Sequence, residues 1–326
     1  MRSKYVGFFF KTAITTVLGL SMIGNADAST SQPAGLNLGA TSFGDGFARP
    51  TPGFVYEQYF QYFDFSAIND KNGNAIGRPV FNNQHIGAEV SLNQIIYLSP
   101  IHLFGGLLGA TVLLPIVNSF SYNDTPSFVS LKAVGFGMGD LTWGAFLQMP
   151  PIFNGGRPVF VQRFEFDVIS PTGTYSTKKD VNDGAGYWSL NPHYEFSVLP
   201  TPKTMLSVRL HYLYNFRNDN PASSTPLPSG SNYQAGQAFW TNFDVAYAVL
   251  PKLYVGMNGY YFQQFTQDKI DRVSQADSET TNLSIGPGLF YTANAQNLFF
   301  ANAYLPVIEK NTTSGFHLVA RWVHFF

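Results

Sequence analysis

The chain has 326 residues, of which 12% are charged, about half the roughly 25% typical of soluble globular domains. Its formal net charge of −1 excludes the basic surface by which proteins hold nucleic acids, so no DNA or RNA partner is expected. The lack of cysteine excludes disulfides, thiolate metal ligands and cysteine nucleophiles.

The first 28 residues have the pattern of an export signal. Two basic residues, Arg2 and Lys4, precede a mostly apolar stretch at 12–23, and Ala26-Asp27-Ala28 fits the small-x-small cleavage rule. We therefore predict a cleavable signal peptide over residues 1–28. No later run of about 18 apolar residues occurs, so the sequence predicts no membrane-spanning helix.

Residues 29–52 form a separate unit that is rich in glycine and proline and has no strand periodicity. Two interpretations of this unit stay open. It could be a loose periplasmic leader before the first strand, as chain termini often are. Alternatively, it could fold back into the molecule as a plug.

Apolar and polar residues alternate in stretches of roughly a dozen residues, which is typical of strands with one face in each of two environments. The aromatic content of 16% and the many glycines and prolines also favour short strands joined by turns. The predicted strands cover approximately 53–65, 85–98, 105–117, 139–149, 158–170, 188–198, 206–217, 237–250, 253–266, 280–292, 297–308 and 315–326.

The connections between these strands alternate in length. Short links such as 199–203 and 250–252 follow every second strand, and long polar segments such as 218–236 and 267–279 follow the others. Strands of about 11 residues are long enough to cross the hydrocarbon layer when tilted. In lipid an open sheet edge would leave unpaired amide groups, so the sheet must close.

The predicted fold class is therefore all-β: a transmembrane antiparallel β-barrel of about 12 strands over residues 53–326, with a polar interior and an apolar outer face. An even strand number places both ends of the barrel on the periplasmic side and the long loops outside. In the second strand, Ile86, Ala88 and Val90 alternate with polar residues. We expect this apolar face to contact lipid and Glu89 to face the lumen.

Charged side chains on the polar faces are the candidate site. Because the 199–203 turn is short, Glu195 should lie opposite Arg209, and Arg163 should lie near His193 or Glu195. We predict an Arg163, Glu195, Arg209 ladder that either braces the barrel or selects solutes. The lumen candidates are Glu89, Arg163, Glu165, Asp167, His193, Glu195, Arg209, His211, Asp244 and Arg321.

An outer-membrane hydrolase is the enzymatic alternative, because such enzymes place a Ser, His and acidic triad on a barrel wall. Ser197 with His193, or Ser207 with His211, are the candidate pairs. Residues four apart on a strand are about 13 Å apart, too far for direct proton transfer. A triad assembled across strands stays possible, but the favoured interpretation is that the protein is no enzyme; no catalytic residue, cofactor or metal site is predicted.

The chain ends on an aromatic residue, with apolar residues at two-residue steps before it. Trp322 and Phe326 resemble the signal that the bacterial barrel-assembly machinery recognises, and we expect this machinery to be a partner.

Several motifs resemble those of the meta-pathway phenol-degradation family, which includes sphingosine-responsive outer-membrane proteins. The resemblance covers nearly all of the chain after residue 28. Its motifs are Ser91-Leu92-Asn93-Gln94, Tyr97-Leu98-Ser99-Pro100, Arg163-Phe164-Glu165-Phe166, Pro171-Thr172-Gly173-Thr174-Tyr175, Trp188-Ser189-Leu190-Asn191-Pro192, Thr201-Pro202-Lys203, Leu210-His211-Tyr212-Leu213-Tyr214-Asn215-Phe216, Gln234-Ala235-Gly236-Gln237, Asn258-Gly259-Tyr260-Tyr261, Gly286-Pro287-Gly288 and Arg321-Trp322-Val323-His324.

The resemblance implies an outer-membrane protein of a Gram-negative bacterium that takes up hydrophobic or aromatic small molecules, with a link to phenol degradation. It brings no catalytic set. The expected partners are outer-membrane lipid, lipopolysaccharide and a hydrophobic small-molecule substrate. A non-conducting barrel that senses or binds a lipid-like amphiphile, or has a structural role, is the alternative function.

Overall fold

The structure is a computed structural model that describes residues 32–33, 35–49, 51–77, 80–123, 132–222 and 230–326. The predicted signal peptide lies outside these residues. The described part of the chain is built from strands and connecting loops. None of its segments forms a helix with the length and apolar character needed to cross a bilayer.

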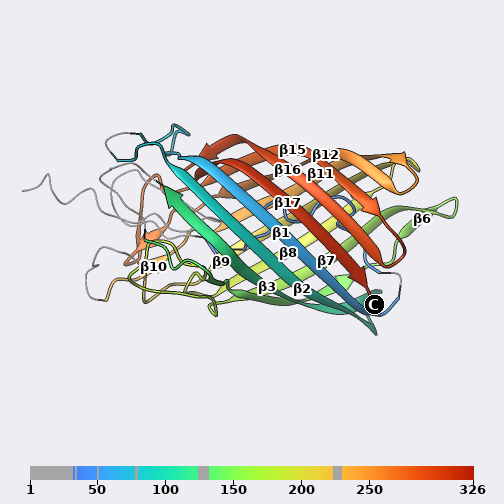
Figure 1. The fold of residues 1–326 in the computed structure, drawn as a ribbon. Helices are drawn as coiled ribbons and strands as arrows, with labels where there is room; N and C mark the ends of the chain where they lie inside the picture. The colour runs from blue at the N-terminus through green and yellow to red at the C-terminus, as the bar shows by residue number, and fades with distance from the viewer. Residues whose placement is uncertain (1–31, 34, 50, 78–79, 124–131, 223–229) are drawn as a thin grey trace, which may run out of the picture.

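Twelve long antiparallel strands form one closed ring, so the predicted barrel class is confirmed (Figure 1). The first and last strands close it, with pairs running from Val55–Phe325 to Ile68–Thr313. The long strands are β1 (Gly53–Ile68), β2 (His85–Leu103), β3 (Gly106–Asn123), β5 (Leu141–Gln148), β7 (Arg157–Ser170), β8 (Ser189–Val198), β9 (Thr204–Asn215), β11 (Ala238–Leu250), β12 (Leu253–Gln264), β15 (Thr281–Thr292), β16 (Asn297–Lys310) and β17 (Thr313–Phe325).

The two ends of the barrel differ. At the turn end, where β1 begins and β17 ends, neighbouring strands are joined by short connections such as 199–203. At the loop end lie the longer connections 69–84, 171–188, 216–237 and 265–280. The remaining strands are short: β4 (Gly137–Met138), β6 (Ile152–Asn154), β10 (Tyr233–Gln234), β13 (Lys269–Ile270) and β14 (Val273–Ser274). Of these, β10, β13 and β14 form a small sheet within the loop-end connections.

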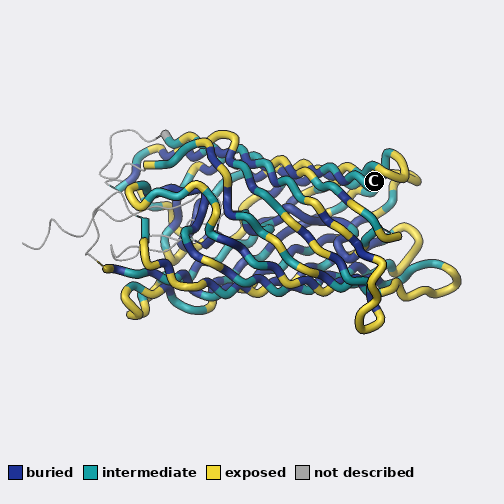
Figure 2. Tube along the Cα trace, turned by 90° about the horizontal axis from the view of Figure 1, so that it is seen from below, coloured by how far each residue is buried: buried dark blue, intermediate teal, exposed yellow. Residues whose placement is uncertain are grey.

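Buried residues alternate with more exposed ones along most of the long strands (Figure 2), as expected when successive side chains point to opposite faces. On β9, Arg209 and His211 are buried inside the barrel, whereas Leu206 and Leu210 are 37% and 47% exposed on the outer face. The predicted orientation is therefore confirmed for this strand. On β8, the polar residues also point inward.

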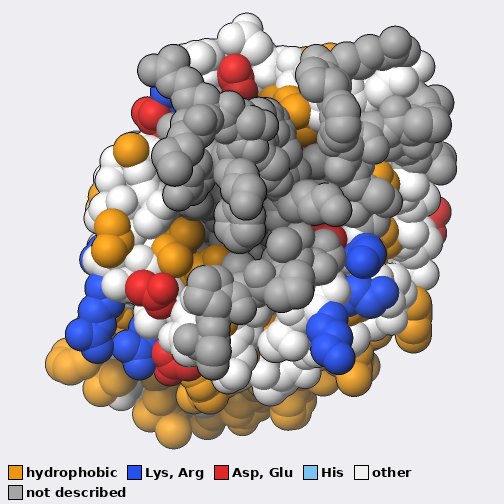
Figure 3. Space-filling view, turned by 90° about the vertical axis from the view of Figure 1, so that its left-hand side faces the viewer, with side chains coloured by type: hydrophobic (Ala, Val, Ile, Leu, Met, Phe, Trp, Pro, Cys, Tyr) orange, Lys and Arg blue, Asp and Glu red, His pale blue; other side chains and the backbone are white. Residues whose placement is uncertain are grey.

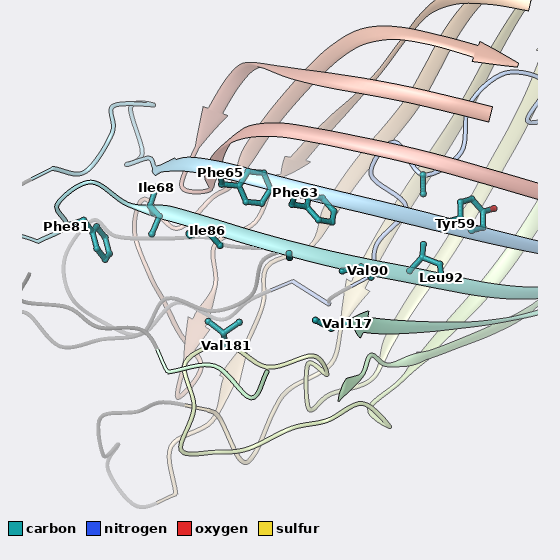
Figure 4. Packing of buried hydrophobic residues seen from close by; sticks show 12 residues of the cluster. Tyr59, Phe63, Phe65, Ile68, Phe81, Ile86, Val90, Leu92, Val117 and Val181 are labelled. Atoms are coloured by element: carbon teal, nitrogen blue, oxygen red, sulfur yellow. The ribbon is translucent and has the colours of Figure 1, made fainter. Parts of the chain in front are cut away.

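On β2 the predicted orientation is wrong. Ile86, Ala88, Val90 and Leu92 point into the barrel, where they pack with residues of β1 and the loop end (Figure 4). Glu89 alternates with them and therefore lies on the outward face, opposite Tyr62 of β1. Glu89 is thus not a lumen residue. The cluster comprises Ala40, Tyr59, Phe63, Phe65, Ile68, Phe81, Ile86, Ala88, Val90, Leu92, Val117 and Val181.

The physical reason for this inversion is that alternation separates two faces without saying which of them meets lipid. A packed barrel interior accepts apolar side chains as readily as a bilayer does. The polar outward side chains of β1 and β2 instead contact one another. His85 lies 2.9 Å from Asp64, and the Tyr56 hydroxyl donates to Asn93 over 2.8 Å.

This orientation predicts unequal effects for two substitutions on β2. We expect Leu92→Ala, which would leave a cavity in the cluster, to lower the free energy of unfolding by about 2–5 kcal/mol. Ile95→Ala should cost less, because Ile95 is 55% exposed on the outer face, where acyl chains can fill the space. Urea unfolding in lipid vesicles measures both. A larger loss for Ile95→Ala would contradict the orientation.

Candidate functional site in the barrel lumen

Residues 35–49, here called the inner segment, lie inside the barrel and not beside it. The Tyr304 hydroxyl of β16 donates to the Gly39 carbonyl over 2.7 Å, and the Gly39 amide donates to Asn242 of β11 over 3.1 Å. On the opposite wall, the Gly46 amide donates to Ser197 of β8 over 3.2 Å. The inner segment therefore spans the lumen from β11 and β16 to β8.

Two glycines permit this close fit. Gly39 has a φ of +76°, and a Cβ atom there would lie 2.7 Å from the Tyr304 ring. A Cβ atom at Gly46 would lie 2.7 Å from the backbone nitrogen of Ser197 and 2.7 Å from the carbonyl oxygen of Val161. Only glycine allows the backbone to approach the wall this closely without displacement.

Ionisable side chains cross the lumen at the level of the inner segment and are here called the charged belt; all are buried except Glu57, whose side chain is 15% exposed. The belt consists of Asp45, Glu57, Arg163, Glu165, Asp167, His193, Glu195, Arg209, His211, Asp244 and Arg321. Every predicted lumen residue except Glu89 belongs to it. Their role in selecting solutes stays a prediction.

The predicted ladder of Arg163, Glu195 and Arg209 is confirmed as a set of contacts. Glu195 is paired in register with Arg163 of β7 and Arg209 of β9. Its side chain is fully buried, and it contacts the Nε of Arg163 and lies 2.5 Å from the Nη2 of Arg209. Glu165 lies 2.9 Å from the Nη2 of Arg163.

Sequence reasoning missed Asp45 and Glu57, which complete the belt. The Asp45 carboxylate accepts two hydrogen bonds from Arg209, at 3.0 and 3.2 Å, and lies 3.9 Å from Arg321. Glu57 of β1 lies 3.7 Å from Arg321. Asp45 precedes Arg209 by 164 residues in the sequence, and it lies in a segment that has no strand periodicity. No signal in the sequence links the two residues.

The two serines considered for hydrolysis, Ser197 and Ser207, form hydrogen bonds with each other and with the inner segment. Ser197 donates to Ser207 over 2.9 Å, and Ser207 accepts the Gly44 amide over 2.9 Å. The rings of His193 and His211 instead lie tilted against one another with centroids 4.6 Å apart, and His211 stacks on Trp240 at 4.1 Å. The serines therefore hold the inner segment against the wall.

A cavity of about 390 Å³ lies between the inner segment and the barrel wall. Belt residues line one part of it, including Glu165, His193 and Arg209. Its other part is apolar and lies toward the turn end, where Phe43, Phe146, Met205, Phe290 and Phe300 line it. The cavity can thus hold a small apolar molecule beside charged groups.

Figure 3 views the loop end, where charged side chains lie around the rim and hydrophobic side chains cover the outer wall below it. There, Asp140, which directly precedes β5, binds the 171–188 connection. Its carboxylate accepts hydrogen bonds from the amides of Gly173 at 2.9 Å and Ala185 at 2.7 Å. Burial raises its pKa to about 6, although backbone hydrogen bonds act against this rise. Burial also raises the pKa of Asp183 to about 7.

The raised pKa of Asp183 predicts a pH-dependent loop end. The folded loop holds a proton that an unfolded loop, with an ordinary pKa near 3.8, releases, so its stability is full below about pH 4 and is lost as the pH rises through 7. We expect hydrogen-exchange protection of residues 171–188 to fall as the pH rises from about 4 through 7, and the part of this fall above pH 6 to come mainly from Asp183.

Asp183→Asn should abolish most of the fall above pH 6, whereas Asp219→Asn, at an exposed carboxylate, should not alter it. Below pH 6 the raised pKa of Asp140 should leave a residual slope in Asp183→Asn, whereas Asp219→Asn should keep the whole slope. An unchanged slope above pH 6 in Asp183→Asn would refute the assignment.

Among solved structures, an outer membrane channel from Pseudomonas putida F1 is similar to this chain, with a TM-score of 0.74 and 17% identity over 88% of this chain and 100% of the other. The toluene transporter TodX of Pseudomonas putida matches with a TM-score of 0.46 and 10% identity over 96% and 98% of the two chains. The toluene transporter TbuX of Ralstonia pickettii matches at 0.44 and 9% identity over 91% and 98%. No curated protein sequence matches the chain.

The first of these structures supports the barrel fold alone, because the sequences differ at most positions. The family comparison goes further, since a family model matches residues 66–322 and therefore most of the barrel. The predicted family is thereby confirmed, and the chain belongs to the family described as the MetA-pathway of phenol degradation.

Proposed function

We propose that the protein is an outer-membrane channel for the uptake of hydrophobic or aromatic small molecules. The observation that carries this proposal is the cavity of about 390 Å³ inside a closed barrel, with an apolar wall toward the turn end. A porin for sugars or ions would line its passage with polar groups throughout. The family description, which names phenol degradation, favours aromatic substrates.

The proposal includes the orientation and location of the barrel. Exposed aromatic and aliphatic side chains on the outer wall suit an acyl environment, and the charged loop end suits the lipopolysaccharide layer. Export would use the signal peptide at 1–28. Insertion would use Trp322, on the outward face of β17, and the exposed Phe326 that follows this strand.

In this mechanism the apolar part of the cavity binds the substrate, and the inner segment and belt restrict the passage of water and ions. An apolar solute gains by leaving water for the cavity, whereas an ion must leave its hydration shell. The inner segment must move, or leave a side passage, for the substrate to cross.

The occupied lumen also favours a second candidate, a barrel that binds an amphiphile without conducting it. Proteoliposomes separate the two functions. We expect radiolabelled toluene or phenol derivatives to enter vesicles bearing the protein faster than protein-free vesicles, and a deletion strain to grow poorly on low concentrations of such compounds. Substrate binding without any accelerated entry would favour the sensor, and neither binding nor entry would refute both.

A further inference from the structure

One corner of the charged belt, between β7 and β8, combines carboxylates with an imidazole. Glu165 and Asp167 project from β7 and His193 from β8, and one ligand atom from each lies within 4.8 Å of the others. All three side chains are buried. Gly144 on β5 leaves space for this corner, because a Cβ atom there would lie 2.1 Å from an oxygen of Asp167.

The hydrogen bonding of His193 leaves one ring nitrogen available. Its Nδ1 lies 3.3 Å from the Asn191 carbonyl oxygen, which can only accept, so Nδ1 carries the proton of a neutral imidazole. The lone pair of Nε2 then faces Glu165, whose carboxylate oxygen is 3.6 Å away. Nε2 is buried and has no hydrogen-bond partner in the described part of the chain.

A lone pair directed at a carboxylate is repulsive unless a cation or a proton lies between them. Histidines that bind metals typically donate their other ring N–H to a backbone carbonyl, as His193 does to Asn191. A carboxylate has two oxygens, so Glu165 can keep its contact with Arg163 and still offer an oxygen to a metal.

The charge of the belt also favours a bound cation. Its carboxylates outnumber its arginines, and Asp167 lies near His193 but forms no ion pair with an arginine among the described residues. The carboxylates are Asp45, Glu57, Glu165, Asp167, Glu195 and Asp244, and the arginines are Arg163, Arg209 and Arg321. Unpaired buried charge is costly, and a divalent cation would offset it.

We propose that Glu165, Asp167 and His193 bind a divalent transition-metal ion on the lumen wall. One imidazole and two carboxylates suit Zn²⁺, which accepts nitrogen and oxygen ligands, better than Ca²⁺ or Mg²⁺, which prefer oxygen alone. Because all three residues line the cavity, a remaining coordination position would be open to water or solute. The site would also link β7 to β8. This proposal does not depend on the proposed transport function.

The test is zinc binding by the full barrel in detergent, produced without a histidine tag and stripped with chelator. We expect titration calorimetry and elemental analysis to find one Zn²⁺ per chain. His193→Gln and Asp167→Asn should weaken binding by more than about 100-fold, since even residues that only support a metal ligand are worth 10–100-fold.

His317→Gln is the matched control, because His317 is also buried in the lumen but contacts Gln61 and aromatic rings. It should bind zinc like the unaltered protein. The electrophoretic mobility of each variant with and without heating shows whether its barrel is folded. If His193→Gln or Asp167→Asn does not fold, Glu165→Gln is tested in its place. The proposal is overturned if the unaltered protein binds no stoichiometric zinc, as a shared proton would predict. It is also overturned if folded variants of His193 and Asp167 bind zinc normally, as adventitious binding at the exposed His85 would predict.

Discussion

Deletion of residues 35–49 is expected to raise the ion conductance of the reconstituted protein severalfold. These residues cross the lumen and bind both walls, through Gly39 to β11 and β16 and through Gly46 to β8. Their removal would join the cavity of about 390 Å³ to the space that the inner segment fills. Single-channel recording in planar bilayers measures the change.

Asp45→Ala is a milder form of the same experiment. It removes the hydrogen bonds to Arg209 and the contact with Arg321, and it leaves the backbone of the inner segment intact. We expect conductance between those of the unaltered and deleted proteins, with frequent transitions between levels. Asp64→Ala removes a carboxylate from the outer face and serves as the control. Equal conductance in all of these proteins would mean that the inner segment does not limit passage.

The second large effect concerns stability. Glu195→Ala is expected to lower the free energy of unfolding by about 3–5 kcal/mol, because it leaves Arg163 and Arg209 buried with one carboxylate fewer between them. Asp219→Ala, which breaks the exposed pair with Arg217, should cost about 1 kcal/mol or less. Urea unfolding in lipid vesicles, followed by tryptophan fluorescence, compares the two.

A double variant tests the cause of this loss. Arg163→Met combined with Glu195→Ala should be less destabilised than the sum of the single variants, because the Arg163 guanidinium that would lose one of its two carboxylates is itself removed. Arg209 would keep its hydrogen bonds to Asp45. Strictly additive losses would show that the two side chains act independently, and the ladder would then not be the source of the effect.

The sequence by itself determined the strands and the ladder. Alternation with a period of two is a local property, so the strands predicted at 158–170, 188–198 and 206–217 agree within two residues at each end with β7, β8 and β9. A short turn fixes the register of the two strands that it joins, so Glu195 could be placed opposite Arg209. Closure followed from the cost of unpaired amides at an open sheet edge in lipid.

Only the tertiary structure decided which face of β2 is inside and where the inner segment lies. Lipid and a packed interior are both apolar, so the alternation around Val90 is compatible with either orientation, and the neighbouring strands select one. Asp45 reaches Arg209 only because the inner segment lies inside the barrel, and Glu57 reaches Arg321 only because β1 pairs with β17 where the ring closes. Such contacts depend on three-dimensional proximity, which no local periodicity encodes.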